Sequence, residues 1–162
     1  MAETPEEKVG KILRKTGWTL AVAESCTGGL IGHRLTNVPG SSTYYLGSIT
    51  AYAYRAKVRL LQVSWDTLEE HGAVSEAVVK EMAAGVRQTL GADVGLSVSG
   101  IAGPSGGTAD KPVGFVWIGL SMPDETYTLN MTASGDRLAN KSSFASAALK
   151  FLVHQLEAYG KD

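Results

Sequence analysis

The sequence contains a single cysteine, Cys26, and only three histidines, His33, His71 and His154, which lie far apart. A single cysteine cannot form a disulfide within the chain, and this usage is typical of proteins in a reducing compartment. Scattered histidines without neighbouring cysteines do not have the spacing of a structural metal site. We therefore expect a cytoplasmic protein with no metal centre and no bound cofactor.

Basic blocks and long apolar runs are also missing. The 15 lysine and arginine residues nearly balance the 16 aspartate and glutamate residues, so the formal net charge is −1. No segment has the positive patch expected of a nucleic-acid binder, and no run of apolar residues is long enough to cross a bilayer. Residues 1–8 are polar and acidic, unlike a signal peptide. The sequence predicts neither nucleic-acid nor membrane partners.

The chain alternates between apolar runs typical of strands and amphipathic stretches typical of helices. Strands are expected over 19–23, 44–52, 94–98, 113–121 and 125–132. Helices are expected over 5–16, 28–35, 56–61, 67–71, 75–90 and 137–159. This order, in 162 residues without a repeat or linker, predicts one α/β domain over residues 1–162. The expected architecture is a three-layer α/β/α sandwich with a mixed sheet.

The first predicted strand runs into a turn of small and polar residues that opens a helix. Ser25 and Thr27 supply hydroxyls in this turn, Glu24 supplies a carboxylate, and Gly28 allows a tight bend. The unpaired N–H groups of a helix start stabilise an anionic ligand or an oxyanion. The same residues are also ordinary helix caps and packing glycines, so the turn alone does not decide between the two interpretations.

A second loop, 99–103, has the same character and also follows an apolar strand. If both loops lie at one end of the sheet, they form two walls of one pocket, because ligand crevices lie outside the carboxyl ends of strands. Tyr52, Arg55 and Lys57 follow a third strand. Their spacing lets only part of this set share a direction on a helix.

These residues favour one kind of catalysis over another. No histidine lies beside a serine in a recognisable pattern, which argues against a Ser-His-Asp triad. A serine activated by a lysine, Lys57, is the available substitute for attack on an amide or ester carbonyl. Arg55 and Arg137 are candidates to bind an anionic group, although both also fit solvated surface charges.

Several motifs of the chain together resemble the CinA C-terminal domain family. These motifs are Ala23–Gly29 (AESCTGG), Val38–Ser42 (VPGSS), Ala56–Leu61 (AKVRLL), His71–Ser75 (HGAVS) and Ser99–Pro104 (SGIAGP). The resemblance implies an α/β/α fold, a homodimer or higher homo-oligomer, and no metal. It also implies nicotinamide-nucleotide amidase activity, the hydrolysis of nicotinamide mononucleotide to nicotinic acid mononucleotide and ammonia in pyridine-nucleotide salvage.

The resemblance also implies a set of functional positions. They fall on Ser25, Ser42, Tyr52, Lys57, Ser99 and Arg137. We expect Ser25 to be the nucleophile and Lys57 its base, with Ser42 as the competing nucleophile and Tyr52 beside them. Phosphate recognition is assigned to Arg137 and to the 99–103 loop, including Ser99, Gly100 and Gly103. Thr27, Gly28 and Arg55 are also expected to bind substrate.

The chain departs from the family where strand and helix join, because Ala53 and Tyr54 replace the usual serine and asparagine. This loss of two polar groups near the expected pocket leaves an alternative open, in which the domain binds a nucleotide without turning it over. A third possibility, a structural dimerisation domain, is suggested only by the hydrophobic Tyr44 to Leu46 and by the edge of the predicted hairpin.

Overall fold

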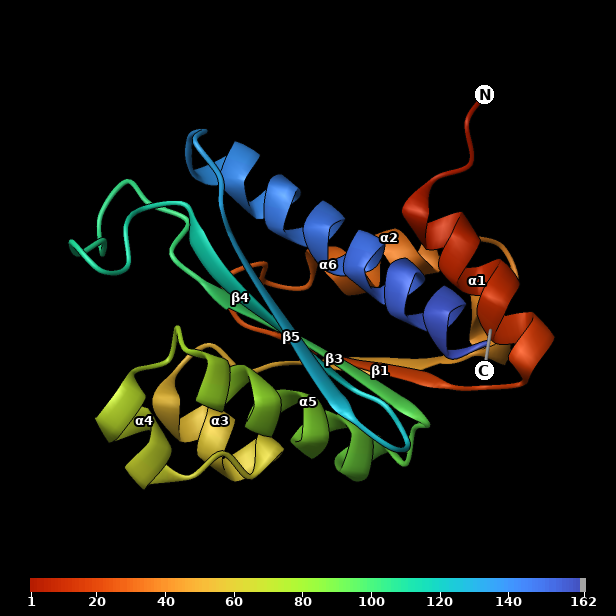
Figure 1. The fold of residues 1–162 in the computed structure, drawn as a ribbon, viewed down its shortest axis with the longest axis horizontal. Coiled ribbons are helices and arrows are strands. Elements are labelled where there is room, and N and C mark those ends of the chain that lie inside the picture. The colour runs from red at the N-terminus through yellow and green to blue at the C-terminus, as the bar shows by residue number, and fades with distance from the viewer. Residues whose placement is uncertain (161–162) are drawn as a thin grey trace.

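A five-stranded mixed sheet forms the middle layer of the computed structural model, with helices on both faces (Figure 1). The strand order is β2-β1-β3-β4-β5. The first three strands in this order are mutually parallel, and β4 and β5 are antiparallel to their neighbours. The predicted α/β/α sandwich with a mixed sheet is therefore confirmed. The structure describes residues 1–160, so the last two residues of the predicted 1–162 domain lie outside the described residues.

The observed elements follow the sequence pattern closely. The strands are β1 (Leu20–Glu24), β2 (Tyr45–Thr50), β3 (Val94–Gly100), β4 (Phe115–Ser121) and β5 (Thr126–Thr132). The helices are α1 (Pro5–Thr16), α2 (Leu30–Thr36), α3 (Tyr54–Leu61), α4 (Trp65–His71), α5 (Glu76–Leu90) and α6 (Arg137–Tyr159), and a short 3-10 turn, η1 (Ser41–Thr43), precedes β2. The strand predicted over 44–52 ends at Thr50, which places Tyr52 in the turn that follows.

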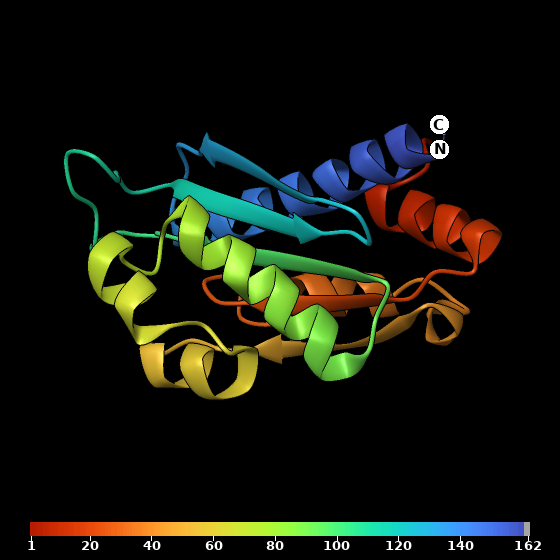
Figure 2. The same cartoon turned by 60° about the horizontal axis from the view of Figure 1, so that its bottom comes forward.

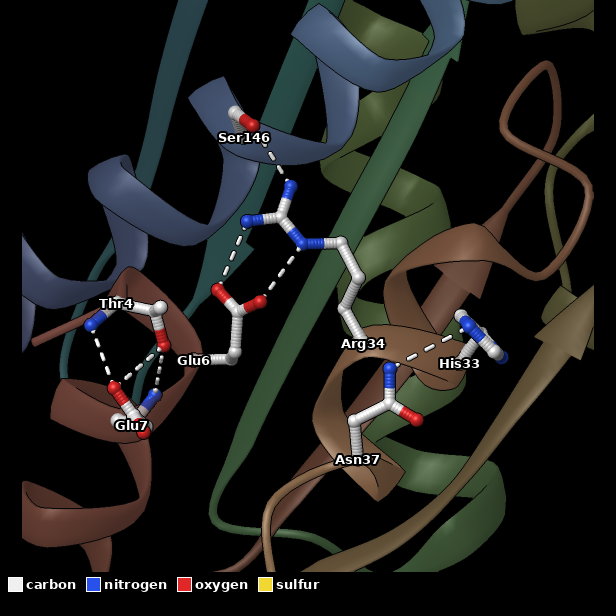
Figure 3. A network of polar contacts seen from close by, with 7 residues as sticks. All are labelled: Thr4, Glu6, Glu7, His33, Arg34, Asn37 and Ser146. Carbon is white, nitrogen blue, oxygen red and sulfur yellow. Dashed lines mark hydrogen bonds and ion pairs between the residues drawn. The ribbon is translucent and has the colours of Figure 1, made fainter.

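Helices α1, α2 and α6 cover one face of the sheet (Figure 1). A polar network ties these three helices together (Figure 3). Arg34 of α2 donates two hydrogen bonds to Glu6 of α1, with Nε–Oε1 at 3.1 Å and Nη2–Oε2 at 2.8 Å, and a third to Ser146 of α6, with Nη1–Oγ at 2.7 Å. The planar fork of arginine suits this two-pronged contact, which fixes the helices of this layer relative to one another.

Helices α3, α4 and α5 cover the other face (Figure 1). Strand β1 is buried on both sides, because Leu20 and Val22 face the α1–α2–α6 layer while Ala21 and Ala23 face α5. A parallel strand that is covered on both faces has a continuous run of apolar residues, and residues 20–23 form such a run. The short alanine side chains on one side allow α5 to lie close to the sheet.

The parallel register places the ends of β1 and β3 side by side. Leu20 pairs with Val94, and Glu24 pairs with Val98, so the turn after β1 and the loop after β3 leave the same end of the sheet. This confirms that the two small-residue loops are neighbours. The long loop between β3 and β4 projects at this end, and the N-terminus and the last turn of α6 lie at the other (Figures 1 and 2).

Candidate active site

A cavity of about 340 Å³ opens at the carboxyl ends of the parallel strands. Four parts of the chain contribute to it: the turn after β1, the segment from β2 into α3, the turn between α4 and α5, and the loop after β3, with one side chain from α6. The lining residues are Ser25, Cys26, Tyr52, Lys57, Ala73, Val74, Ser99, Gly100, Ile101, Ala102, Gly103, Ser105, Gly106 and Arg137. Their position matches the expectation that ligands bind beyond the carboxyl ends of strands.

Ser25 is the first residue after β1, and its backbone N–H donates to the carbonyl of Val98 at 3.2 Å. The turn that carries it is held by the buried carboxylate of Glu24. That carboxylate accepts hydrogen bonds from the Thr27 hydroxyl at 2.7 Å and from the N–H groups of Ile31 at 2.9 Å and Gly32 at 3.1 Å. Because α2 has no side-chain cap of its own, Glu24 does the work of an N-cap and fixes the turn.

Lys57 lies on α3 and is 1% exposed. Its Nζ lies 2.9 Å from each of three oxygen atoms: the hydroxyl Oγ of Ser25, the carbonyl of Ala51 and the carbonyl of Tyr52. Lys57 and Leu61 lie one helical turn apart on α3, so both side chains lie on the buried side of the helix. Lysine is rarely buried without a charged partner, and the three contacts here come from neutral groups.

Burial lowers the pKa of the Lys57 amine to about 8. Desolvation disfavours the ammonium form, and no carboxylate contacts the amine to offset it. A neutral amine has two N–H groups and one lone pair. The ammonium form donates all three contacts, to the Ser25 hydroxyl and to the carbonyls of Ala51 and Tyr52. After losing a proton, the amine can keep donating to both carbonyls and turn its lone pair to the Ser25 hydroxyl, which then becomes the donor.

Cys26 also lines the cavity but is not equipped as a nucleophile. Burial raises the pKa of its thiol to about 12. Because the thiolate is the reactive form, this cysteine stays unreactive near neutral pH. Of the two neighbouring side chains, the hydroxyl of Ser25 is the one hydrogen-bonded to the Lys57 amine.

The opposite wall of the cavity carries hydroxyls and a guanidinium group. Ser99, at the end of β3, lines the cavity together with Gly100 and Gly103. Arg137, the first residue of α6, donates from Nη1 to the carbonyl of Gly103 at 2.7 Å, and its Nη2 lies 3.5 Å from the hydroxyl of Tyr52. The Arg137 side chain thus spans the mouth of the cavity from the loop to the α3 side.

The structure separates the remaining predicted residues from this cavity. Ser42 lies in η1, before β2, whereas Ser25 and Tyr52 lie beyond the other ends of β1 and β2. At about 3.3 Å per residue, the length of β2 alone separates the two ends by roughly 16 Å. The expectation that Ser42 lies close to Tyr52 and Lys57 is therefore wrong within one chain.

Three other predicted substrate-binding residues also lie outside the cavity. Arg55 is exposed on the outer side of α3 and is not among the lining residues. Thr27 and Gly28 line a different hollow, of about 380 Å³, and the Thr27 hydroxyl is used by Glu24. The prediction that Thr27 and Gly28 join Ser25 in the substrate cavity is therefore wrong, because they line a separate hollow.

The two departures from the family pattern prove to lie beside the cavity, not in its lining. Ala53 is the N-cap residue of α3 and gives that helix no side-chain cap. The ring of Tyr54 packs against Trp65 of α4, with their centroids 6.3 Å apart. The departures therefore remove polar groups from the start of α3. The contact between Lys57 and Ser25 does not involve these positions.

Sequence reasoning missed two parts of the site. Ala73 and Val74, in the turn between α4 and α5, close one side of the cavity, and only their place in a family motif signals this. Asn140 of α6 is 1% exposed and hydrogen-bonds to the cavity loop. The sequence could have indicated Asn140 as a polar residue on the apolar face of the last helix, because it lies four residues before the buried Phe144.

Two negative findings apply to residues 1–160. No helix there is long and apolar enough to span a membrane. The same residues contain no group of three or more histidine, cysteine, aspartate or glutamate side chains arranged to hold a metal ion.

Comparison with known proteins places the chain. The family model of the CinA C-terminal domain matches residues 2–156. A CinA-like protein of Salinibacter ruber is 56% identical over 147 residues, which cover 91% of this chain and 36% of that protein. A CinA-like protein of Desulfosudis oleivorans is 56% identical over 152 residues, covering 93% of this chain and 37% of that protein. The chain thus spans little more than a third of the length of these relatives.

Solved structures agree with this placement. The competence damage-inducible protein A of Klebsiella pneumoniae superposes with a TM-score of 0.91 at 36% identity, covering 94% of this chain and 95% of that one. A competence/damage inducible protein from Agrobacterium tumefaciens gives a TM-score of 0.88 at 33% identity, covering 97% and 99% of the two chains. Family model, relatives and structures lead to one conclusion: the chain belongs to the CinA C-terminal domain family.

Proposed function

We propose that this protein is a metal-independent amidohydrolase that converts nicotinamide mononucleotide and water to nicotinic acid mononucleotide and ammonia. The observation that carries the proposal is the 2.9 Å contact between Lys57 Nζ and Ser25 Oγ inside a cavity that also presents Arg137. A nucleophile within hydrogen-bond reach of a base is the geometry that covalent catalysis requires. The substrate is chosen by family membership together with this chemistry.

In the first half of the reaction, neutral Lys57 takes the hydroxyl proton of Ser25 while Ser25 Oγ bonds to the carboxamide carbon. The carbonyl oxygen of the substrate becomes an oxyanion in the tetrahedral intermediate. The carbon–nitrogen bond then breaks, and the leaving nitrogen takes the proton from the Lys57 ammonium, so that ammonia departs. The products of this half are free ammonia, neutral Lys57 and an ester between the nicotinoyl group and Ser25.

In the second half, water replaces ammonia. Lys57 takes a proton from water as its oxygen attacks the ester carbon, and returns the proton to Ser25 Oγ when the ester bond breaks. The carboxylic acid product leaves and the side chains regain their starting protonation. One water is consumed for each ammonia released, so the cycle balances without any other reactant.

The oxyanion is assigned to a backbone N–H group of the turn that carries Ser25. The N–H groups of Gly28 and Leu30 bond to carbonyls within the turn. We therefore assign the oxyanion contact to the N–H of Cys26, which directly follows the nucleophile and belongs to a residue that lines the cavity. Fixed N–H donors stabilise a developing oxyanion without needing to reorganise.

The exposed wall is assigned to the nucleotide part of the substrate. The guanidinium of Arg137 keeps donors beyond its contact with Gly103 and suits the bidentate binding of a phosphate. Ser99 is 1% exposed and lines the same cavity, and the ring of Tyr52 can flank the pyridine, being 65% exposed. The cavity volume of about 340 Å³ is within the usual range for a small-molecule site.

An ammonia-release assay on nicotinamide mononucleotide tests the proposal, with the nicotinic acid mononucleotide measured in parallel. We expect wild type to release both products in a one-to-one ratio and Ser25→Ala to release neither above background. Binding of the nucleotide by folded wild type without release of ammonia would instead establish the alternative, a nucleotide-binding module. Full activity in Ser25→Ala would overturn the assigned nucleophile.

A further inference from the structure

Asn140 is a buried polar side chain near the start of α6 with both ends of its amide bonded. Its Nδ2 donates to the carbonyl of Ala102 at 3.0 Å, and its Oδ1 accepts from the N–H of Gly135 at 2.9 Å. Ala102 belongs to the loop that lines the cavity, and Gly135 belongs to the turn that starts α6. This side chain therefore joins the cavity loop to the beginning of the last helix.

Arg137 contacts the next carbonyl of the same loop. Asn140 and Arg137 lie three residues apart on α6, a spacing that places both side chains on one side of the helix. They reach the consecutive carbonyls of Ala102 and Gly103. The two contacts differ in exposure, because Asn140 is 1% exposed whereas Arg137 lies at the surface.

This difference assigns separate tasks to the two residues. The hydrogen bonds of a buried amide that is bonded at both its oxygen and its nitrogen are costly to break, since a group left unpaired pays its full desolvation penalty. The Asn140 contacts therefore persist whether or not a ligand is present, while the exposed guanidinium of Arg137 is free to exchange partners. The position of α6 relative to the loop, and with it the direction of Arg137, is set by Asn140.

We propose that Asn140 is a positioning residue for substrate binding, which holds the 99–103 loop and the start of α6 so that Arg137 faces the cavity. This proposal rests on the proposed function, in which Arg137 binds the phosphate of the nucleotide. It assigns no contact with substrate to Asn140 itself. A loss at this position should therefore weaken binding and leave the chemistry at Ser25 largely intact.

The test compares Asn140→Asp with Asn130→Asp, the same chemical change at an exposed position of β5. Aspartate keeps the acceptor for Gly135 but replaces the donor to Ala102 with a second acceptor. We expect KM for nicotinamide mononucleotide to rise about tenfold in Asn140→Asp, with kcat changed less than about threefold, and no change in Asn130→Asp. Asn140→Ser serves as a second variant should the aspartate prevent folding.

A double-mutant cycle with Arg137→Ala separates positioning from a general loss of structure. If Asn140 acts through Arg137, Asn140→Asp should raise KM by less than about twofold when it is made in the Arg137→Ala variant. A double variant whose rise in KM equals the product of the two single rises would overturn the proposal, and so would a fall in kcat at constant KM.

Direct binding makes the outcome independent of turnover. The dissociation constant of nicotinamide mononucleotide, measured by calorimetry, should rise about tenfold in Asn140→Asp even if wild type releases no ammonia. In that case the proposed hydrolysis fails and the positioning role stands. Equal affinity of the variant and wild type, or no binding by either, would overturn the positioning role.

Discussion

Lys57 and Arg137 are both cations of the same cavity, yet the protein holds them in opposite ways. Lys57 is buried, and three oxygen atoms at 2.9 Å surround its amine. Arg137 is exposed and spans the cavity mouth through contacts with Gly103 and Tyr52. Burial lowers the pKa of the Lys57 amine to about 8 and so makes its neutral form accessible, whereas an arginine guanidinium is always charged. In the proposed function, the cavity thus pairs a base for chemistry with a permanent cation for binding.

The same contrast extends to the groups around each cation. Ser25 lies in the turn after a central strand, and the buried carboxylate of Glu24 holds that turn, whereas Arg137 contacts the long connection that follows β3. Precise positioning matters most where bonds form and break, since small displacements there cost large factors in rate. We therefore expect substitutions on the buried side to change kcat and substitutions on the exposed side to change KM.

The largest effect is expected for Lys57→Met, which removes the base and keeps much of the side-chain volume. Loss of general base catalysis should lower kcat by roughly 10²–10⁴-fold. The matched control is Lys80→Met, at an exposed lysine of α5 that pairs with Glu76. Steady-state kinetics on both variants, with thermal unfolding to verify the fold, give the comparison. A Lys57→Met enzyme with more than about a tenth of wild-type kcat would remove the lysine from the mechanism.

The next effect is expected for Arg137→Ala. Hydrogen bonds to charged groups contribute about 1.5–3 kcal/mol, so KM for the nucleotide should rise roughly 10- to 100-fold. Because the guanidinium contacts Gly103 and Tyr52 and takes no part in the contact between Lys57 and Ser25, kcat should change far less. Arg55→Ala, at the exposed arginine outside the cavity, is the control and should leave both constants unchanged. A fall confined to kcat would show that Arg137 belongs with the chemistry.

A smaller effect on rate and a clear effect on stability are expected for Glu24→Gln. The amide retains one oxygen acceptor but directs an NH₂ group toward the donors that the second carboxylate oxygen accepted. The free energy of unfolding should fall by about 1–3 kcal/mol, and kcat should fall by up to about tenfold as the Ser25 turn loosens. Denaturant titration and kinetics measure the two, with the exposed Glu70→Gln as control. Unchanged stability would show that Glu24 does not hold the turn.

The smallest effect is expected for Ser42→Ala. Ser42 lies at the far end of β2, so both kcat and KM should stay within about twofold of wild type. The measurement is the same ammonia-release assay. A loss comparable to that of Ser25→Ala would mean that Ser42 enters the reaction, and would require a second chain to bring it to the cavity.

The layers of the fold could be predicted because burial leaves a periodic signature. The apolar run 19–23, the helical spacing over 75–90 and the hairpin of 113–121 with 125–132 all correspond to observed elements. Neighbouring loops could be expected at one end of the sheet because parallel strands share their direction. Strand order and register were not accessible, since the pattern of one strand says nothing about which strand lies beside it.

The sequence could predict which segments contribute to the site, but not which of their side chains face the cavity. Lys57 and Tyr52 follow a strand end, and both line the cavity, but Arg55, between them in sequence, points away. Ser42 looked close to Tyr52 along the chain, and a full strand separates them in space. Asn140 was missed because its two partners, Ala102 and Gly135, come together only in the folded chain. Side-chain direction and long-range contact therefore needed the structure.

The pH dependence of ammonia release from nicotinamide mononucleotide, compared between wild type and Arg137→Ala, tests the central claim most directly. The pKa of Lys57 is lowered to about 8, and the protonated amine cannot act as a base. Catalysis should therefore be weak at lower pH, and kcat/KM should rise as pH increases through about 8. The rise should occur at the same pH in Arg137→Ala, at a lower overall kcat/KM. A flat profile across this range, or one that falls as pH increases, would contradict catalysis by a neutral Lys57 acting on Ser25.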